Sequence, residues 1–339
     1  MATEQPILTP GADAPPRRGL RLQSRRVVEL VGLGLLVVAP VVLGDSFAID
    51  RLGRYLLLAA FAMTVDVVWG YGGMFTFGHA AFFGGAAYVV AILTTQQNGV
   101  LPLPLWPAVA IGVVAAAALA WAIGAFTFSG RFALRGVEFA VVTLAVSFLL
   151  ERLMNAGGSV TGGQNGILFD VRLEIGPLDL QRRLPFYMLA AVILVAAYFG
   201  LRRFVTARTG LVNLGIREDE DRVALLGYRV PAVKRGVLVL SAALAGFVGS
   251  LYYVHEGIVS PAAVGVDAST LVLLWVVLGG RGTLIGPVVG AVLLNMLTAS
   301  LSGMLLGTWL VVVGVVLVAV ILFFPSGLFG FLSGPEGRR

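Results

Sequence analysis

The 339-residue sequence contains no cysteine, one lysine and two histidines. Without cysteine, disulfide bonds and thiolate metal sites are excluded. The two histidines, His79 and His255, lie far apart in the sequence, so a histidine-rich metal cluster is excluded as well. The pattern GxxxxGK[ST] is absent, and the one lysine, Lys234, is not part of a glycine-rich loop. The chain therefore cannot be its own P-loop ATPase, and we expect no metal or other cofactor.

Charged residues are also scarce, at 12% of the chain, against about 25% in an average soluble domain. Hydrophobic residues make up 58%, and the mean hydropathy is +0.94. Backbone groups in lipid must hydrogen-bond to one another, which leaves helices or a closed barrel. The apolar runs are long and continuous rather than alternating, which favours helices. The sequence therefore predicts an all-α polytopic membrane protein embedded in lipid.

Apolar runs approaching the length needed to span a bilayer predict about ten crossings, or eight or nine if some segments only re-enter. The predicted crossings are residues 27–43, 52–69, 71–95, 105–128, 137–155, 186–201, 236–254, 268–279, 286–301 and 306–324. Basic residues precede the first crossing, follow the sixth and end the chain, which places both termini in the cytoplasm. We interpret the net charge of +6 in this way, and not as a sign of nucleic-acid binding. A cleaved signal peptide is the alternative interpretation of the N-terminal segment.

This topology divides the chain into three parts. We expect a disordered cytoplasmic tail over residues 1–26, a transmembrane domain over 27–325 and a cytoplasmic tail over 326–339. Within the transmembrane domain, residues 208–231 are expected on the cytoplasmic side and residues 156–185 on the opposite side.

A charged island over Gly210–Gly227 interrupts the apolar sequence. The acidic run Glu218–Asp221 is expected in the first turn of a short helix, where carboxylates favour the positive end of the helix dipole. Gly227 is a plausible stop for that helix. The residues alone support two interpretations equally: a helix that couples to a cytoplasmic ATPase, or an ordinary solvated loop.

Two further segments are candidates for a solute path. Thr161–Gly166 reads TGGQNG, in which glycines beside small polar groups can expose backbone amides to a ligand, although turns between two spans explain it more simply. His79 lies in the glycine-rich segment 71–95, which we expect to be a broken or tightly packed helix. An isolated histidine in a membrane is a functional candidate, but a structural hydrogen bond is the commoner role. A third segment, Ser241–Ser250, carries small residues four apart and predicts close helix packing.

Six segments together resemble the LivM-type permease of branched-chain amino-acid ABC importers. They occur in the order of that family: GGMFTFGHAAFFGGAAY (72–88), LRGVEFAVVTLAVS (134–147), TGGQNGI (161–167), GIREDEDRVALLGYRV (215–230), SAALAGFVGSLY (241–252) and LGGRGTLIGPVVGA (278–291). The resemblance implies a BtuC-like helical permease without enzymatic activity in a bacterial inner membrane. It implies a LivH-like second permease, two cytoplasmic ATPase subunits and an extracytoplasmic solute-binding protein as partners.

The resemblance also assigns roles to residues. It implies that the ATPase-coupling residues are Arg217, Glu218, Asp219, Glu220, Arg222 and Gly227. With a weaker match, it implies that the residues near the translocation path are Gly78, His79, Thr161, Gly162, Gly163 and Asn165.

Several alternatives stay open on the sequence. Permeases of the same family serve urea or short amides, so the solute is not fixed. An ion-coupled secondary carrier would need an ion site, for which Asp66 and His79 are the candidates. A structural subunit without a solute path is a third possibility. An intramembrane serine protease is disfavoured, because no GxSxG motif is present and neither histidine has an evident serine partner.

Overall fold

The computed structural model describes residues 46–95, 102–129, 134–176 and 178–304, together with a few positions between 314 and 328. The predicted N-terminal tail and the first predicted crossing (27–43) lie outside the described residues, as do most of the last crossing (306–324) and all of the predicted C-terminal tail except residues 327 and 328. The elements, in chain order, are α2 (Ser46–Asp66), η1 (Val67–Tyr71), α3 (His79–Thr94), α4 (Leu105–Phe128), α5 (Val137–Ala156), η3 (Gly163–Asn165), β1 (Ile167–Leu168), β2 (Glu174–Ile175), β3 (Leu178–Asp179), α6 (Arg183–Thr206), α7 (Arg208–Glu218), α8 (Glu220–Leu225), α9 (Val230–Glu256), β4 (Ile258–Val259), η4 (Pro261–Val264), α10 (Val266–Gly279) and α11 (Ile285–Met304).

The described part of the chain is an all-α membrane bundle. Five of its helical segments are long and apolar enough to cross a bilayer, namely α2 with η1, α4, α6, α9 and α11. Two shorter apolar helices, α3 and α10, begin inside the bundle. The predicted crossings between residues 52 and 301 therefore each correspond to a helix, in the predicted order.

The glycine-rich segment 71–95 is broken, as its composition suggests. The π-helical turn η1 ends at Tyr71, residues 72–78 follow without regular helix, and α3 starts only at His79. Gly78 allows the irregular segment to pass close to α5, because an added Cβ would lie 2.6 Å from the carbonyl oxygen of Thr143 on that helix. A side chain at this position would push the two segments apart.

The small residues of α9 pack within the chain. An added Cβ at Gly246 would lie 2.8 Å from Ala116 Cβ on α4 and 3.0 Å from Ala86 Cβ on α3. Gly249 lies in the same way against the backbone of Phe83 on α3. Close backbone approach at small residues is the usual way in which membrane helices associate. The predicted small-residue face therefore holds α9 against α3 and α4.

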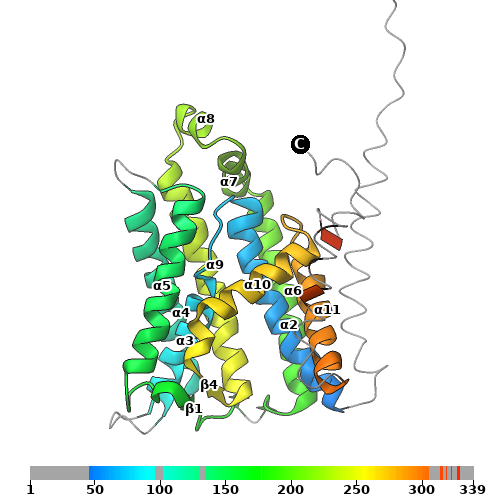
Figure 1. Ribbon diagram of the computed structural model, residues 1–339. Helices are drawn as coiled ribbons and strands as arrows, with labels where there is room; N and C mark the ends of the chain where they lie inside the picture. The colour runs from blue at the N-terminus through cyan, green and yellow to red at the C-terminus, as the bar shows by residue number, and fades with distance from the viewer. Residues whose placement is uncertain are drawn as a thin grey trace, which may run out of the picture.

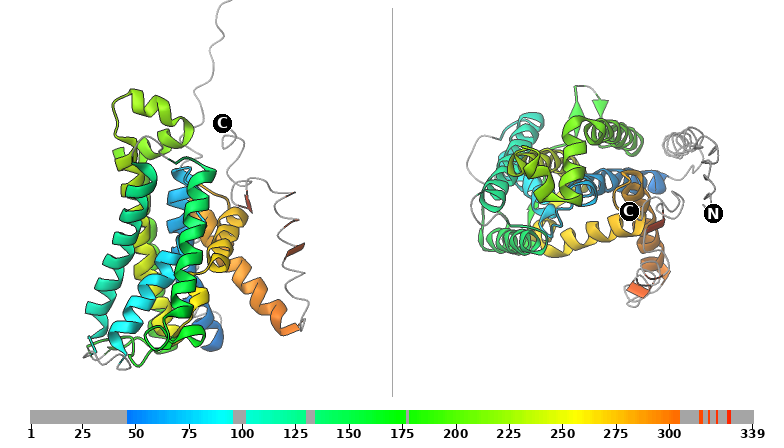
Figure 2. Two further views of the ribbon diagram at one scale, coloured as in Figure 1. Left: turned by 60° about the vertical axis from the view of Figure 1, so that its left-hand side comes forward. Right: turned by 90° about the horizontal axis from the view of Figure 1, so that it is seen from above.

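The molecule has two distinct ends (Figure 1). The hairpin of α7 and α8 projects beyond one end of the bundle, whereas β1 and β4 pair at the opposite end, with Ile167 opposite Val259. The turned view in Figure 2 shows the same projection. The charged island and the TGGQNG segment thus lie at opposite ends, as the predicted topology requires.

Candidate functional site

The charged island forms two short helices instead of the single one expected. Glu218 is the last residue of α7, not part of the first turn of the next helix. Asp219 separates the helices and caps α8, because its side chain accepts a 3.0 Å hydrogen bond from the backbone N–H of Arg222. Gly227 follows α8 with a φ of +86°, a left-handed conformation that favours glycine after a helix. The predicted helix stop at Gly227 is confirmed.

The outer surface of α8 is apolar at its tip. Leu225 is 88% exposed and Leu226 is 71% exposed, and Tyr228 is exposed beside them. The side chain of Arg222 is exposed as well. The two leucines are not among the residues predicted from the sequence, although two adjacent leucines between a charged run and a glycine are a visible signal. Exposed leucines on a hairpin that projects from the bundle are typical of a protein contact.

Arg217, in contrast, turns toward the bundle. Its Nη1 donates a 2.5 Å hydrogen bond to the carbonyl oxygen of Gly70 in η1. Its side chain also lies beside Gly73, where an added Cβ would be 3.1 Å from Arg217 Cγ. Arg217 therefore fastens α7 to the π-helical turn that ends the first described span. π-Helical turns often occur at functional sites.

Asp66 joins the same π-helical turn to a second loop. The buried carboxylate accepts hydrogen bonds from the backbone N–H of Gly282 (2.5 Å) and of Leu284 (3.0 Å). Gly70 lies between them, since an added Cβ there would overlap Asp66 Oδ1 and crowd Gly282 N. The hydrogen bonds of Asp66 thus hold the loop before α11 against η1. Arg217 holds α7 to that turn, so three segments meet there.

Two acidic residues of α8 also point toward the bundle. Glu220 Oε2 accepts a 2.5 Å hydrogen bond from Nζ of Lys234 on α9, whose side chain is only 7% exposed. Asp221 accepts two hydrogen bonds from the Arg135 guanidinium, at 2.8 and 3.1 Å. These bonds hold the pKa of the Asp221 carboxyl below its usual value, and they raise the pKa of Arg135. The two contacts tie α8 to α9 and to the loop before α5.

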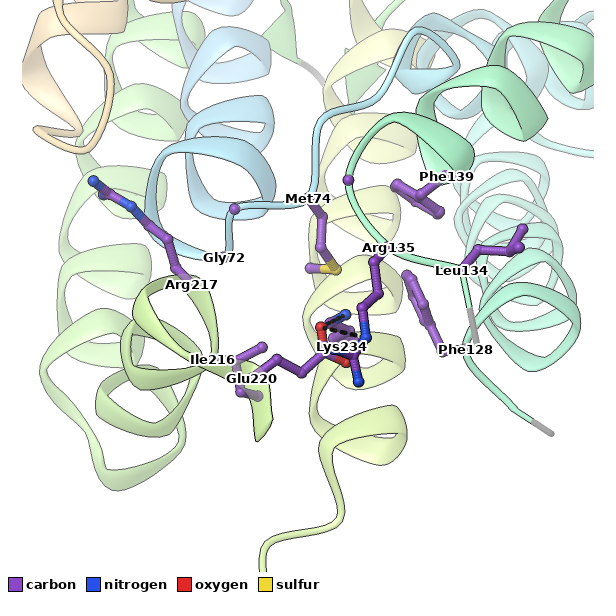
Figure 3. Close-up of a pocket in the computed structure, with 12 residues that line it drawn as sticks. Gly72, Met74, Phe128, Leu134, Arg135, Phe139, Ile216, Arg217, Glu220 and Lys234 are labelled. Carbon is purple, nitrogen blue, oxygen red and sulfur yellow. Dashed lines mark hydrogen bonds and ion pairs between the residues drawn. The ribbon is translucent and has the colours of Figure 1, made fainter. Parts of the chain in front are cut away.

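A cavity of about 230 Å³ lies beneath this hairpin. Figure 3 shows Arg135, Glu220 and Lys234 converging on it, while Arg217 points away from them. The lining residues are Gly72, Gly73, Met74, Phe128, Leu134, Arg135, Gly136, Phe139, Ile216, Arg217, Glu220 and Lys234.

The TGGQNG segment forms a turn at the other end of the molecule. Gly162, Gly163 and Gly166 all have positive φ, and an added Cβ at Gly162 would overlap the carbonyl of Gly166. The Thr161 hydroxyl donates a 2.6 Å hydrogen bond to the carbonyl of Met154 at the end of α5. Asn165 is exposed. The glycines are thus required by the turn itself, and a role in the solute path stays a prediction.

His79 lies inside the bundle, away from that turn. Its Nε2 is 2.9 Å from Ser241 Oγ, and the Ser241 hydroxyl donates a 2.6 Å bond to the carbonyl of Thr64. His79 Nε2 must therefore carry a proton and donate it, and Nδ1 has no partner among the described residues. This is a neutral histidine that links α3 to α9. Gly78 and His79 are not brought together with Thr161, Gly162, Gly163 and Asn165.

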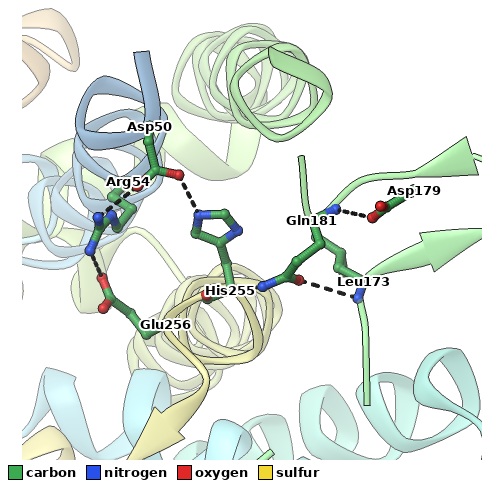
Figure 4. A network of polar contacts seen from close by, with 7 residues as sticks. All are labelled: Asp50, Arg54, Leu173, Asp179, Gln181, His255 and Glu256. Carbon is green, nitrogen blue, oxygen red and sulfur yellow. Dashed lines mark hydrogen bonds and ion pairs between the residues drawn. The ribbon is translucent and has the colours of Figure 1, made fainter. Parts of the chain in front are cut away.

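A polar network at the same end as the TGGQNG turn was not anticipated (Figure 4). Arg54 on α2 donates to Asp50 (2.6 Å) and to Glu256 on α9 (2.8 Å). His255 Nε2 is 2.9 Å from Asp50, and the Gln181 side chain donates to the His255 carbonyl. The network joins α2, α9 and the loop before α6. No local sequence pattern predicts it, because its members are distant along the chain.

The chain is similar to known transport proteins over most of its length. A family profile described as "Branched-chain amino acid transport system / permease component" matches residues 48–321. The permease protein LivM of the Escherichia coli K12 high-affinity branched-chain amino acid transport system is 28% identical over 290 residues, which cover 78% of this chain and 66% of LivM. The match thus spans slightly less than two thirds of that relative's length.

Two other relatives are matched over more of their own length. BraD, from the corresponding system of Pseudomonas aeruginosa PAO1, is 24% identical over 280 residues, which cover 80% of this chain and 91% of BraD. LivH of Escherichia coli K12 is 24% identical over 302 residues, which cover 86% of this chain and 93% of LivH. No solved structure matches the chain.

Proposed function

Because this chain belongs to the family of branched-chain amino acid transport system permease components, we propose that it is a permease subunit of an ATP-driven, binding-protein-dependent importer. Its solute is a branched-chain or related hydrophobic amino acid, the class named for the matched relatives. ATP is hydrolysed by separate ATPase chains, and this chain supplies half of the path and the mechanical link.

The assembly contains a second, LivH-like permease, two cytoplasmic ATPase subunits and an extracytoplasmic solute-binding protein. The chain lies in a bacterial inner membrane with both termini and the α7–α8 hairpin in the cytoplasm. Residues 156–185 face the opposite side, where the binding protein delivers the solute.

One observation carries the coupling role: the hairpin has an outward and an inward surface. Leu225 and Leu226 are exposed at its tip, available to a groove in the ATPase. Arg217 and Glu220 connect the same hairpin to η1 and to α9. An ATPase that holds the tip differently in its two states therefore shifts the equilibrium between two arrangements of the spans.

These two surfaces suggest separate roles for the coupling residues that the family resemblance implies. Arg217 and Glu220 pass the movement to the bundle, and Asp219 and Gly227 shape α8. Glu218 and Arg222 have exposed side chains and flank the contact with the ATPase.

The ion-coupled carrier is disfavoured by the position of Asp66. Both of its carboxylate oxygens accept backbone hydrogen bonds. The η1 turn that follows Asp66 is hydrogen-bonded to Arg217 of α7, so Asp66 lies toward the end of the bundle where α7 is found. A coupling-ion site in a carrier is expected near the midplane, with oxygens free to bind the ion.

The proposal is tested in proteoliposomes that hold all the subunits, with the Leu225→Ser/Leu226→Ser variant compared with wild type. We expect ATP-dependent leucine uptake to fall and the ATPase to be lost from the purified complex. Leu178→Ser, an exposed leucine at the other end of the molecule, is the matched control for ATPase retention. Uptake that ignores ATP and collapses with an ionophore would overturn the proposal. If urea or short amides, but not leucine, compete for uptake, the transported solute is an amide and not an amino acid.

A further inference from the structure

The cavity beneath the α7–α8 hairpin has an apolar side and a charged side. Its apolar side is formed by Met74, Phe128, Leu134, Phe139 and Ile216. Its charged side is formed by Arg135, Glu220 and Lys234, which converge in Figure 3. At about 230 Å³ it is small for a ligand site and suits a molecule of amino-acid size.

The charged side presents both signs within a few ångströms. Lys234 Nζ is 2.5 Å from Glu220 Oε2, and Arg135 Nε lies 3.7 Å from the same oxygen. An ammonium group carries three N–H donors, and the described structure assigns one of those of Lys234, to Glu220. Glu220 likewise accepts through Oε2 only. Both groups keep bonding capacity for a ligand that carries a carboxylate and an ammonium.

Burial strengthens such recognition. The side chains of Lys234 and Glu220 are only 7% and 19% exposed. Charges in such a partly buried site are less screened than they would be in water. A zwitterion that pairs with both residues meets complementary charges, whereas a ligand with one charge leaves one protein group without its second partner.

We propose that this cavity is a binding site for a free amphipathic α-amino acid on the hairpin side of the membrane. The ligand carboxylate is held by Lys234 and Arg135, its ammonium by Glu220, and its side chain by the apolar wall. The identification of the physiological ligand as the transported product rests on the function proposed above.

Occupancy has a mechanical consequence. The cavity walls come from α7 and α8 on the hairpin side, and from α4, α5, α9 and the loops at residues 72–74 and 134–136 on the bundle side. A bound ligand therefore stabilises the hairpin in its present position against the bundle. Accumulated product then slows the next cycle, because the hairpin must move for access to switch.

Binding is tested on the purified complex in detergent, without the solute-binding protein, using labelled leucine as the probe. 4-Methylpentanoate, which lacks the ammonium, and 3-methylbutylamine, which lacks the carboxylate, serve as competitors. We expect each to bind at least about tenfold more weakly than leucine, the effect of one lost charge-assisted hydrogen bond. Equal competition by all three would overturn the proposed recognition.

The site is located with Leu134→Trp, which fills the cavity, and with Val141→Trp as the matched control, since Val141 is exposed further along α5. Leucine binding should be lost in the first variant and kept in the second. In proteoliposomes, leucine on the ATP side should slow uptake in wild type and Val141→Trp, but not in Leu134→Trp. For each variant, the uptake rate with leucine on the ATP side is divided by the rate of the same variant without leucine on that side.

The two proposals fail separately. Leucine binding that Leu134→Trp does not weaken would overturn the cavity site, even if ATP-driven uptake is normal. Absence of ATP-driven uptake, with leucine binding that Leu134→Trp abolishes, would overturn the importer function and leave the site standing.

Discussion

Gly70 shows how closely the segments approach beneath the hairpin. Its neighbours are Asp66 Oδ1 and the backbone N–H of Gly282, and an added Cβ has no room between them. We expect Gly70→Ala to lower the stability of the purified protein by about 1–3 kcal/mol, the usual cost of overpacking. The measurement is the shift of the thermal unfolding midpoint in detergent.

Gly85 on α3 is the matched control for that substitution. An added Cβ there meets nothing within 4 Å, and the backbone is helical. Gly85→Ala should therefore leave stability unchanged or raise it by about 0.5–1 kcal/mol, because glycine is the poorer helix former. Equal midpoints for the two variants would show that the contact at Gly70 does not constrain the fold.

At the scale of elements, Arg217 makes a direct side-chain hydrogen bond between α7 and η1. We expect Arg217→Gln to reduce uptake about fivefold or more while the complex still hydrolyses ATP, a loss in the usual range of coupling energies. The reason is that the hydrogen bond to Gly70 disappears while the exposed leucines stay available to the ATPase. The measurement is solute imported per ATP hydrolysed.

Arg208→Gln is the control, since Arg208 is an exposed arginine in the first turn of the same helix. It should leave the ratio of solute to ATP unchanged. Were both arginine variants to lower the ratio equally, the effect would come from the charge of α7 and not from the contact with η1.

The pair of Arg135 and Asp221 fixes α8 to the loop before α5. The folded-state pKa of Asp221 is lowered from 3.8, so its contribution to stability is present above that value and is lost as pH falls through the lowered pKa. The pair should therefore be insensitive to pH near neutrality. Arg135→Asp and Asp221→Arg should each reduce uptake by placing like charges together. The double reversal should recover part of the loss but not all of it, because Arg135 also lies 3.7 Å from Glu220, where the reversed charge is repelled.

The test is the uptake rate of the three variants, each divided by the amount of the chain in the membrane. A double variant as weak as the singles would mean that the pair does not position α8. Raised ionic strength should narrow the gap between wild type and the single variants, since both partners are exposed to solvent.

At the scale of the whole molecule, hydropathy predicted the succession of helices, because membrane spans must satisfy their own backbone. The stop at Gly227 was also predictable from local chemistry. The contacts of Glu220 and Asp66 were not predictable, because their partners are Lys234 and the loop at Gly282, which are distant from them along the chain. The same holds for the break before α3, where Gly78 meets Thr143.

The orientation of the bundle in the membrane is the remaining large-scale prediction, and the absence of cysteine makes it simple to test. Single cysteines replace Leu225 at the hairpin tip and Leu178 at the other end, both exposed. In intact spheroplasts, a membrane-impermeant maleimide should label Leu178→Cys and spare Leu225→Cys. After permeabilisation and removal of the ATPase, which would cover Leu225 in the complex, it should label both. Labelling of Leu225→Cys in intact cells would place the hairpin outside, where no ATPase could reach it, and would overturn the coupling role of α7 and α8.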